Sequence, residues 1–520
     1  MTKLLFKRGA ILLTVVIMLV VLYATSSENL LENLPSESDI ISSILQKQEQ
    51  EADLLKQITK DQEQAIKDLE NERQKIIDDL TVTVPIPKVD TDIEDFNQLF
   101  DHSIRHTFIV DFTSDEFFGL VNDMYEYNQE FGWIDFRNNN YHKVSVTYID
   151  DDSTMTIEDV GIRTKGNVYS RRVPWDGNNV IDTHYVLKFN ETFNFVEGTP
   201  EYEELKTREV FNIEKLIFKY NNTNDPAVSN EVYSTELFSQ MGVVMPKASY
   251  AELIIKIDGV VKNSSLYNIF EFPDEEFLRR VYNEEDVKEV GNFYKMVYPA
   301  DLTPIFDQNN IGVRDWVSGF RPIYGRETNK LNTDYSDLVN FTFALSEANL
   351  INRKAYLEAN FDVDSFLRSM AVNVLVGNPD DYRGNLNNYY MYIDTSGYTT
   401  YIPFDYDNSL GSGWPGDDSF IRFTLDNDIY DWGRISWGVY TERPLVDNIL
   451  EYEEYQILYE NYLEELIETG YFSYSAYDAF VNVPKSLYGD LYYINNDKQY
   501  FFDEKIIDTI VQIKYYRDQR

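Results

Sequence analysis

The order of strand and helix patterns along this chain is the feature that most restricts its fold. Short alternating segments occur from about His106 onward: HTFIVDF, HKVSVTYID, THYVLKFN, EKLIFKY and YAELIIKIDGVV. Such alternation predicts half-buried strands. Helical segments lie among them, such as SNEVYSTELFSQMG, which ends at Gly242 in the position that a helix C-cap favours. After about Glu271 longer helical patterns dominate, so the chain predicts an α+β domain with a strand-rich first half and a helix-rich second half.

The composition excludes several classes of function. The 520 residues contain no cysteine, which rules out disulfides and zinc–cysteine sites. The chain has 89 acidic and 46 basic residues, and the resulting net charge of −43 disfavours binding to nucleic acid. The four histidines form no HExxH pair, and neither a phosphate-loop motif nor a GxGxxG fingerprint is present. A hydrophobic content of 43% still predicts a substantial core.

The N-terminus, MTKLLFKRGAILLTVVIMLVVLYATSS, places basic residues ahead of an uncharged stretch from Gly9 to Ser27. About 20 apolar residues span a bilayer as a helix, and a basic flank keeps the N-terminus in the cytoplasm. We therefore expect residues 1–27 to be a single-pass membrane anchor, with the C-terminal domain extracellular. A cleaved secretory signal ending at ATSS is the alternative.

A polar helical pattern follows the apolar run. Between residues 36 and 80 there is neither Gly nor Pro, and apolar residues recur at mixed spacings of three and four. This predicts a helical stalk within 28–84, either a coiled coil that joins molecules into a homo-oligomer or a solitary solvated helix. Pro85 and Pro87 then end the helix and begin a linker over 85–105.

Acid and amide residues are concentrated in NPDDYRGNLNNYYMYIDTSGYTTYIPFDYDNSLG, from Asn378 to Gly411. If NLNNYYMYI pairs with YTTYIP as a hairpin, Asp380, Asn388 and Asp405 come to the same end of a sheet. Carboxylate and amide oxygens in one place suit Mg²⁺ or Mn²⁺, and such an ion commonly carries nucleotide phosphates. The alternative is that these residues only form turns, which favour Asn and Asp.

Cations are concentrated in GIRTKGNVYSRRVPW. Arg163 and Lys165 are two residues apart and share one face of an extended segment, with Arg171 and Arg172 close behind. They could bind a phosphate, or they could balance local acids in a loop. Lys188, in the middle of the apolar strand YVLKF, is a third cationic candidate.

Several motifs occur in one order: VGIRTKGN, YVLKF, MGVVMPKASYAELIIKIDG, LYNIFE, NFYKM and GNPDDY…NNYYMYID…IPFDYDNSLG. Together they resemble the spore-coat CotH kinase-like family, from about His106 to the C-terminus. The resemblance implies a two-lobed, divergent protein-kinase-like domain, with a strand-rich lobe at 106–275 and a helix-rich lobe at 276–520. It also implies the use of ATP and of Mg²⁺ or Mn²⁺.

The resemblance also implies roles for individual residues. These are catalysis by Asp380, metal binding by Asn388 and Asp405, cofactor contacts by Arg163, Lys165 and Lys188, and pairing of a lysine by Glu231 or Glu236. Asp381 is an alternative to Asp380. Asp380 is preferred because Asn378 sets the register of the motif. Phe404 replaces the tryptophan that the family usually has before the last aspartate.

The sequence thus predicts an extracytoplasmic protein kinase that transfers the ATP γ-phosphoryl group to Ser/Thr hydroxyls of secreted, envelope or coat proteins. The alternative is a non-catalytic surface or spore-coat assembly or adhesion scaffold with the same fold. A glycoside hydrolase that uses paired carboxylates is a third possibility, without motif support.

Overall fold

The structure is a computed structural model in which residues 94–520 are described, apart from 133–134, 152, 168–170, 221–228, 283–289, 414–424, 426, 432–441 and 493–497. Five isolated helical residues between Gln46 and Gln64 are also described. The chain divides into two compact units, Met1–Pro85 and Ile86–Arg520, and the second unit contains the fold described below.

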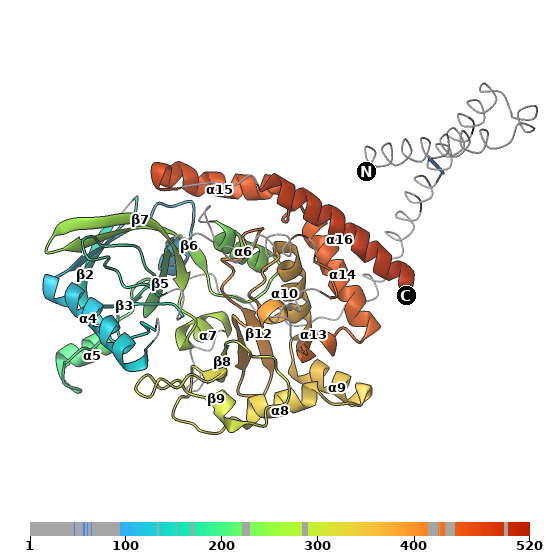
Figure 1. Ribbon diagram of the computed structural model, residues 1–520, viewed down its shortest axis with the longest axis horizontal. Coiled ribbons are helices and arrows are strands. Elements are labelled where there is room, and N and C mark those ends of the chain that lie inside the picture. The colour runs from blue at the N-terminus through green and yellow to red at the C-terminus, as the bar shows by residue number, and fades with distance from the viewer. Residues whose placement is uncertain are drawn as a thin grey trace, which may run out of the picture. The chain divides into compact units, whose positions relative to one another are not determined.

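Seven strands of the first half close into a barrel in the order β1-β2-β3-β4-β5-β7-β6 (Figure 1). Neighbouring strands are antiparallel except for β1 and β6, whose parallel pairing closes the barrel. The strands are β1 (Thr107–Phe112), β2 (His142–Ile149), β3 (Thr154–Thr164), β4 (Tyr185–Lys188), β5 (Lys215–Tyr220), β6 (Ala248–Ile257) and β7 (Val260–Glu271).

Successive side chains along a strand point to opposite sides of the barrel wall, so the strands contribute to two different cores. Phe108 and Phe218 point inward, and their rings lie 5.1 Å apart in an apolar core inside the barrel. Val186 and Ile217 belong instead to the core of the second half, so the β4–β5 wall packs against it. The first half also contains α3 (Glu94–Leu99), α4 (Ser114–Phe131), α5 (Pro200–Lys206) and α6 (Asn230–Gln240).

The second half has its own five-stranded sheet, in the order β12-β11-β8-β10-β9. Its strands are β8 (Asn292–Met296), β9 (Ile311–Gly312), β10 (Tyr324–Arg326), β11 (Tyr389–Ile393) and β12 (Thr399–Pro403). Its helices are α7 (Glu275–Tyr282), α8 (Ser336–Leu345), α9 (Leu350–Asn360), α10 (Val363–Val376), α11 (Tyr382–Asn385), α13 (Pro444–Asp447), α14 (Glu453–Glu468), α15 (Tyr474–Tyr488) and α16 (Gln499–Gln519), with 3-10 turns at Gln308–Asn310 and Gly489–Leu491.

Helix α10 is the centre of the second half. It is buried along most of its length and packs against α14, α6 and β12. The helix ends at Gly377, whose φ of 66° is the left-handed conformation that a helix C-cap commonly adopts. The chain leaves α10 directly into the segment that carries Asp380, so this rigid helix positions the candidate site.

The predicted strands at HTFIVDF, HKVSVTYID, THYVLKFN, EKLIFKY and YAELIIKIDGVV are confirmed as β1, β2, β4, β5 and β6. The predicted hairpin is confirmed as well, because β11 and β12 are antiparallel and Tyr389 pairs with Pro403.

Other parts of the predicted architecture require correction. The strand-rich part is a closed barrel, because β1, the first strand, pairs with β6 and leaves no free edge there. In the part of the chain that the structure describes, no helix is long and apolar enough to cross a bilayer, since these helices carry polar residues alongside the apolar residues that they bury. The predicted anchor, its role as a membrane partner and the single-pass, extracellular location are therefore not retained. The segment 1–27 lies outside the described residues, as does the stalk at 28–84 except for the isolated helical residues.

Candidate active site

The β11–β12 hairpin places two predicted residues beside each other. Asn388 directly precedes β11, and its carbonyl oxygen accepts a hydrogen bond from the Phe404 N–H at 3.2 Å. Asp405 follows Phe404, so both side chains start from the same end of the hairpin, as expected. Asn388 and Asp405 have φ values of 55° and 68°, a left-handed conformation that is uncommon outside glycine and clusters at functional sites.

Lys219 is the centre of an ion cluster at this end of the sheet. It projects from β5, is 5% exposed, and contacts the Glu231 carboxylate of α6 at 2.6 Å. Its ammonium also contacts Asp405, and Asp407 lies 3.6 Å away. One lysine of the barrel thus joins a helix of the first half to the loop after β12.

The charges within this cluster shift one another's pKa values. Burial and then Asp405 raise the pKa of Glu231 to about 8 and raise that of Asp407 above its ordinary value, although Lys219 opposes both shifts. Burial acts to lower the pKa of Lys219, but Asp405, Asp407 and Glu231 outweigh it and raise that pKa well above its ordinary value. Burial acts to raise the pKa of Asp405, but Lys219 and Lys165 outweigh it and hold that pKa below its usual range. Lys219 therefore remains an ammonium and Asp405 a carboxylate at neutral pH.

The same three acids fit a divalent cation. Glu231, Asp405 and Asp407 each offer a carboxylate oxygen, and these oxygens lie within 4.8 Å of one another. Hard oxygen donors at this density suit Mg²⁺ or Mn²⁺. Asn388, a predicted metal ligand, donates its amide N–H to Asp380 at 2.8 Å, and this bond does not use its amide oxygen.

Two further lysines face the cluster across an aromatic ring. The Lys165 and Lys295 ammonium groups lie 5.4 and 5.5 Å from the centre of the Phe404 ring. Burial lowers the pKa of Lys165 to about 7, although Asp405 opposes the shift. Burial likewise lowers the pKa of Lys295 to about 8. Three lysines near one aspartate place ammonium groups where phosphate oxygens could bind.

Asp380 is held by three amides. Its carboxylate accepts hydrogen bonds from Asn385 at 2.6 Å, Asn387 at 3.2 Å and Asn388 at 2.8 Å. Burial raises the pKa of Asp380 to about 7; these bonds oppose the shift, and Asp405 and Asp407 add to it. A carboxyl group with a pKa near neutrality, in a fixed orientation, is suited to accept a proton from an alcohol.

Asp381 has a structural position. Its side chain is fully buried, caps α11 by accepting the Gly384 N–H at 2.5 Å, and also accepts from Asn373 of α10. The turn is tight, because a Cβ at Gly384 would lie 2.1 Å from the Pro379 carbonyl oxygen. Of the two adjacent acids, Asp380 is therefore the one directed toward the ion cluster.

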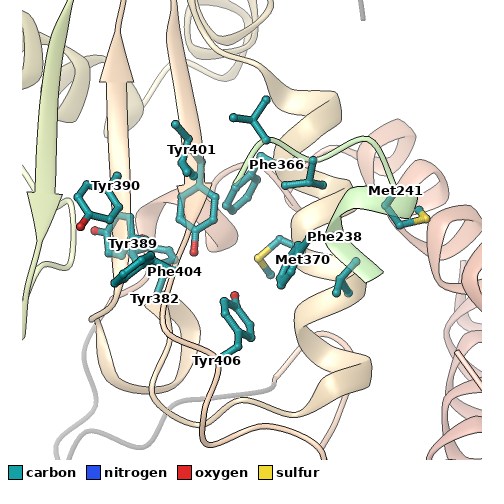
Figure 2. Close-up of a cluster of buried hydrophobic side chains, with 14 of the residues drawn as sticks. Phe238, Met241, Phe366, Met370, Tyr382, Tyr389, Tyr390, Tyr401, Phe404 and Tyr406 are labelled. Atoms are coloured by element: carbon teal, nitrogen blue, oxygen red, sulfur yellow. The ribbon is translucent and has the colours of Figure 1, made fainter. Parts of the chain in front are cut away.

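An aromatic cluster fixes the loop that carries Asp405. Phe404 packs edge-on against Tyr390, with the ring centres 5.4 Å apart. Tyr406 is 1% exposed, and its ring lies 4.7 Å from that of Phe238 on α6. Figure 2 shows Tyr406 directed toward Phe238 and Met370. The helix that supplies Glu231 and the loop that supplies Asp405 are thus packed together through Phe238 and Tyr406.

Two of the predicted cofactor residues lie outside the ion cluster. Arg163 and Lys188 line a cleft of about 620 Å³, together with Lys215 and Phe272. Lys188 forms an ion pair with Glu191 at 2.9 Å and has no contact with Glu231.

The pairing of the candidate glutamates is also clear from the structure. Glu231 is the one that pairs with a lysine, whereas Glu236 accepts from Gln240 on the same helix.

Lys219, Asp407 and Lys295 are functional candidates that the sequence analysis did not select. A signal for Lys219 was present, since it shares a strand face with Ile217 in EKLIFKY just as Lys188 shares one with Val186 in YVLKF. Only the barrel shows which of the two strands faces Glu231.

A family model described as CotH kinase protein matches residues 162–520, which is more than half of the chain. The chain belongs to the CotH kinase family. This confirms the resemblance that the sequence motifs indicated, and it covers β4 to the C-terminus, including every residue of the ion cluster.

Individual relatives are more distant from this CotH kinase family member. Inner spore coat protein H of Bacillus subtilis (strain 168) is 26% identical over 246 residues, which are 47% of this chain and 60% of that protein. The crystal structure of a Helicobacter pylori proinflammatory kinase, CtkA, aligns with 12% identity and a TM-score of 0.24, over 58% of this chain and 92% of that one. At such a TM-score, membership of the family rests on the family match.

Proposed function

We propose that this CotH kinase family member is an active protein kinase that transfers the γ-phosphoryl group of ATP to Ser or Thr hydroxyls. The observation that carries the proposal is the ion cluster, in which Lys219 joins Glu231 to Asp405 while Asp380 lies on the neighbouring turn. Phosphoryl transfer needs little covalent help from the protein, and the main requirements are positioned cations and an oriented acceptor.

Each group has a part in such a reaction. Asp405 and Asp407, with Glu231 in reach, would hold a divalent cation, which neutralises charge on the nucleotide phosphates. Lys219, Lys165 and Lys295 supply positive charge to the phosphate oxygens. Asp380 orients the acceptor hydroxyl and takes its proton, consistent with a pKa near 7.

The cleft provides room for the nucleoside end of ATP. Lys215 lines it at the start of β5, and Lys219 lies four residues along the same strand. At about 3.3 Å per residue the two positions are roughly 13 Å apart, a separation suited to a nucleoside triphosphate lying along the strand. Phe272 provides an apolar surface in the same cleft.

Coat proteins are the acceptors that we propose. The support is the name of the curated relative, an inner spore coat protein, of which this chain matches 60%.

Nucleotide binding by the full chain tests the proposal, measured by calorimetry with and without Mg²⁺ or Mn²⁺. We expect binding that depends on the metal and is lost in Asp405→Ala. Asp478→Ala removes an exposed acid on α15 that bonds only to Asn482, and this matched control should bind as the wild type does.

Transfer of labelled phosphate from γ-labelled ATP to isolated coat proteins then separates a kinase from a scaffold. Asp380→Ala should retain nucleotide binding and lose transfer. A folded wild-type chain that binds no nucleotide with either metal would contradict the proposal and favour the non-catalytic assembly scaffold.

A further inference from the structure

Five arginines gather beside the candidate active site in a chain whose net charge is −43. They come from three separate segments: Arg137 follows α4, Arg163 and Arg171 lie on and after β3, and Arg314 and Arg321 lie between β9 and β10. Their charges act on one another, because burial and then Arg163, Arg314 and Arg137 lower the pKa of Arg171 well below its ordinary value. Here these residues are called the arginine cluster.

The cluster has too few anions of its own. Arg137 forms an ion pair with Asp135 at 2.5 Å. Among the described residues, no carboxylate lies within ion-pair distance of the other four arginines. Arg171 is only 5% exposed and gives one N–H to the Asn138 carbonyl oxygen, which is a neutral acceptor.

Within the part of the chain that the structure describes, several buried guanidinium N–H groups also have no acceptor. They are Nε of Arg163, Nε of Arg171, and Nε and one Nη of Arg314. Leaving a buried charged donor unsatisfied costs more than an ordinary hydrogen bond contributes. Such donors on converging arginines therefore indicate a ligand that supplies both negative charge and oxygen acceptors.

Phosphate has the chemistry that fits best. A phosphate monoester carries nearly two negative charges and three acceptor oxygens, and guanidinium groups bind it through paired N–H bonds. A single carboxylate offers half the charge, and the carboxylate already present, Asp135, is engaged with Arg137.

The exposed residues around the arginine cluster favour a phosphate group that is attached to a protein. Arg321 is exposed on the loop that also carries Val317, 86% exposed, and Phe320, 40% exposed. Apolar residues exposed beside a charged site are typical of surfaces that bind proteins. Lys295 of β8 pairs with Gly325 of β10, which directly follows the loop that carries Arg321, so the cluster adjoins the candidate catalytic site.

We propose that the arginine cluster, through Arg171, Arg314 and Arg321, binds a phosphoserine or phosphothreonine of the acceptor protein. This site is separate from the Lys219–Asp405 site and from the cleft that Arg163 lines. The inference rests on the proposed kinase function, since it assigns a substrate class to the same enzyme. An acceptor phosphorylated once is then held while a neighbouring hydroxyl reaches Asp380, so closely spaced acceptor residues are modified in succession.

Binding of two labelled peptides to the full chain tests the assignment without ATP or metal. Both are neutral Gly–Ser peptides of one sequence, and one carries a single phosphoserine. By fluorescence anisotropy we expect the phosphopeptide to bind about tenfold more tightly than its twin. Arg314→Gln/Arg321→Gln should abolish this preference. Arg368→Gln, which removes an arginine paired with Asp364 on α10, should retain it, with circular dichroism confirming that each variant folds.

Two further measurements identify the source of the phosphate. Asp405→Ala, which removes the proposed nucleotide site, should leave phosphopeptide binding unchanged, so a failure of the kinase proposal does not affect this result. Saturating ATP with Mg²⁺ should not displace the phosphopeptide from the wild type. Equal affinity for both peptides would overturn the proposal. Complete displacement of the phosphopeptide by ATP would also overturn it, because the arginines would then bind the nucleotide.

Discussion

Lys219 occupies a position at which a metal cation would compete with it. Its ammonium contacts the acids that form the candidate metal site, and it is 5% exposed. Removing one partner from a buried ion cluster leaves uncompensated charge, which is strongly destabilising. The lysine therefore contributes to the stability of the fold as well as to the proposed chemistry.

Lys219→Met should lower the free energy of unfolding by about 3–5 kcal/mol. Because the three carboxylates then repel one another, Mg²⁺ or Mn²⁺ should raise the melting temperature more in the variant than in the wild type. Differential scanning calorimetry with and without metal measures both effects.

Lys188→Met is the matched control, since Lys188 is partly exposed and pairs only with Glu191. Lys188→Met should lower the free energy of unfolding by less than about 1 kcal/mol. Metal should raise its melting temperature by as much as it raises that of the wild type. A Lys219→Met protein that metal does not stabilise would contradict the metal site.

The pKa of Asp380 predicts how the reaction rate depends on pH. Its pKa is raised to about 7, so the carboxyl group is protonated below that pH and cannot accept the hydroxyl proton. The kcat/KM for protein phosphorylation should therefore rise as Asp380 deprotonates near pH 7. It should fall again as Lys165 and Lys295 lose their charge, because their pKa values are about 7 and about 8. Steady-state kinetics between about pH 5.5 and 8.5 would reveal this bell-shaped dependence.

The same shift has a consequence for stability. A carboxyl group with a folded-state pKa above the model value of 3.8 binds more protons when folded, so its contribution falls as pH rises from about 4 to 7. Asp380→Asn should remove that loss while it abolishes transfer. Burial also raises the pKa of Asp381 to about 7, so Asp381→Asn should change the pH dependence of stability in the same direction. It should further destabilise the protein, because it weakens the cap of α11, and it should retain transfer. Transfer that is lost in Asp381→Asn but kept in Asp380→Asn would exchange the two roles.

At the scale of elements, the site depends on how α6 packs against the loop after β12. Phe238 of α6 contacts Tyr406, and Glu231 of the same helix pairs with Lys219. A change in that packing would separate the two sides of the ion cluster without touching a charged residue.

Phe238→Ala should cost about 3–5 kcal/mol of unfolding free energy through the cavity that it creates. It should also weaken metal-dependent ATP binding, since α6 can then shift relative to Asp405. Calorimetric titration measures this, and the conservative Phe238→Leu should restore most of the affinity. Unchanged binding in a folded Phe238→Ala protein would show that the α6 packing does not control the site.

Individual elements were well predicted where the local pattern was strong. Alternation identified five strands of the barrel, and the hairpin that unites Asn388 and Asp405 followed from turn residues between two aromatic strands. The partner of Glu231 was not predictable, because Lys188 and Lys219 have the same local pattern and differ only in which part of the barrel wall faces α6.

At the scale of the whole molecule, one core joins the two halves. Val186 and Ile217 from the barrel wall are buried in the same apolar cluster as α10 and the β11–β12 hairpin. The halves therefore lose packing together when either one unfolds.

We expect the Ile86–Arg520 unit to unfold in a single calorimetric transition, with equal calorimetric and van't Hoff enthalpies. Ile217→Ala, which weakens the barrel side of the shared core, should lower the melting temperature of the whole transition. Two separate transitions, of which only one shifts, would show that the halves are independent.

The sequence by itself determined the mixed α+β content, a strand-rich half followed by a helix-rich half, and the family, because alternation, turn residues and ordered motifs are local properties of a chain. It also indicated Asp380, Asn388 and Asp405, which lie close together on one hairpin. Closure of the barrel, the choice of Lys219 over Lys188 and the arginine cluster were decided only by the tertiary structure. Each joins residues that are far apart in the sequence, and such pairings depend on which surfaces the whole chain can bury together.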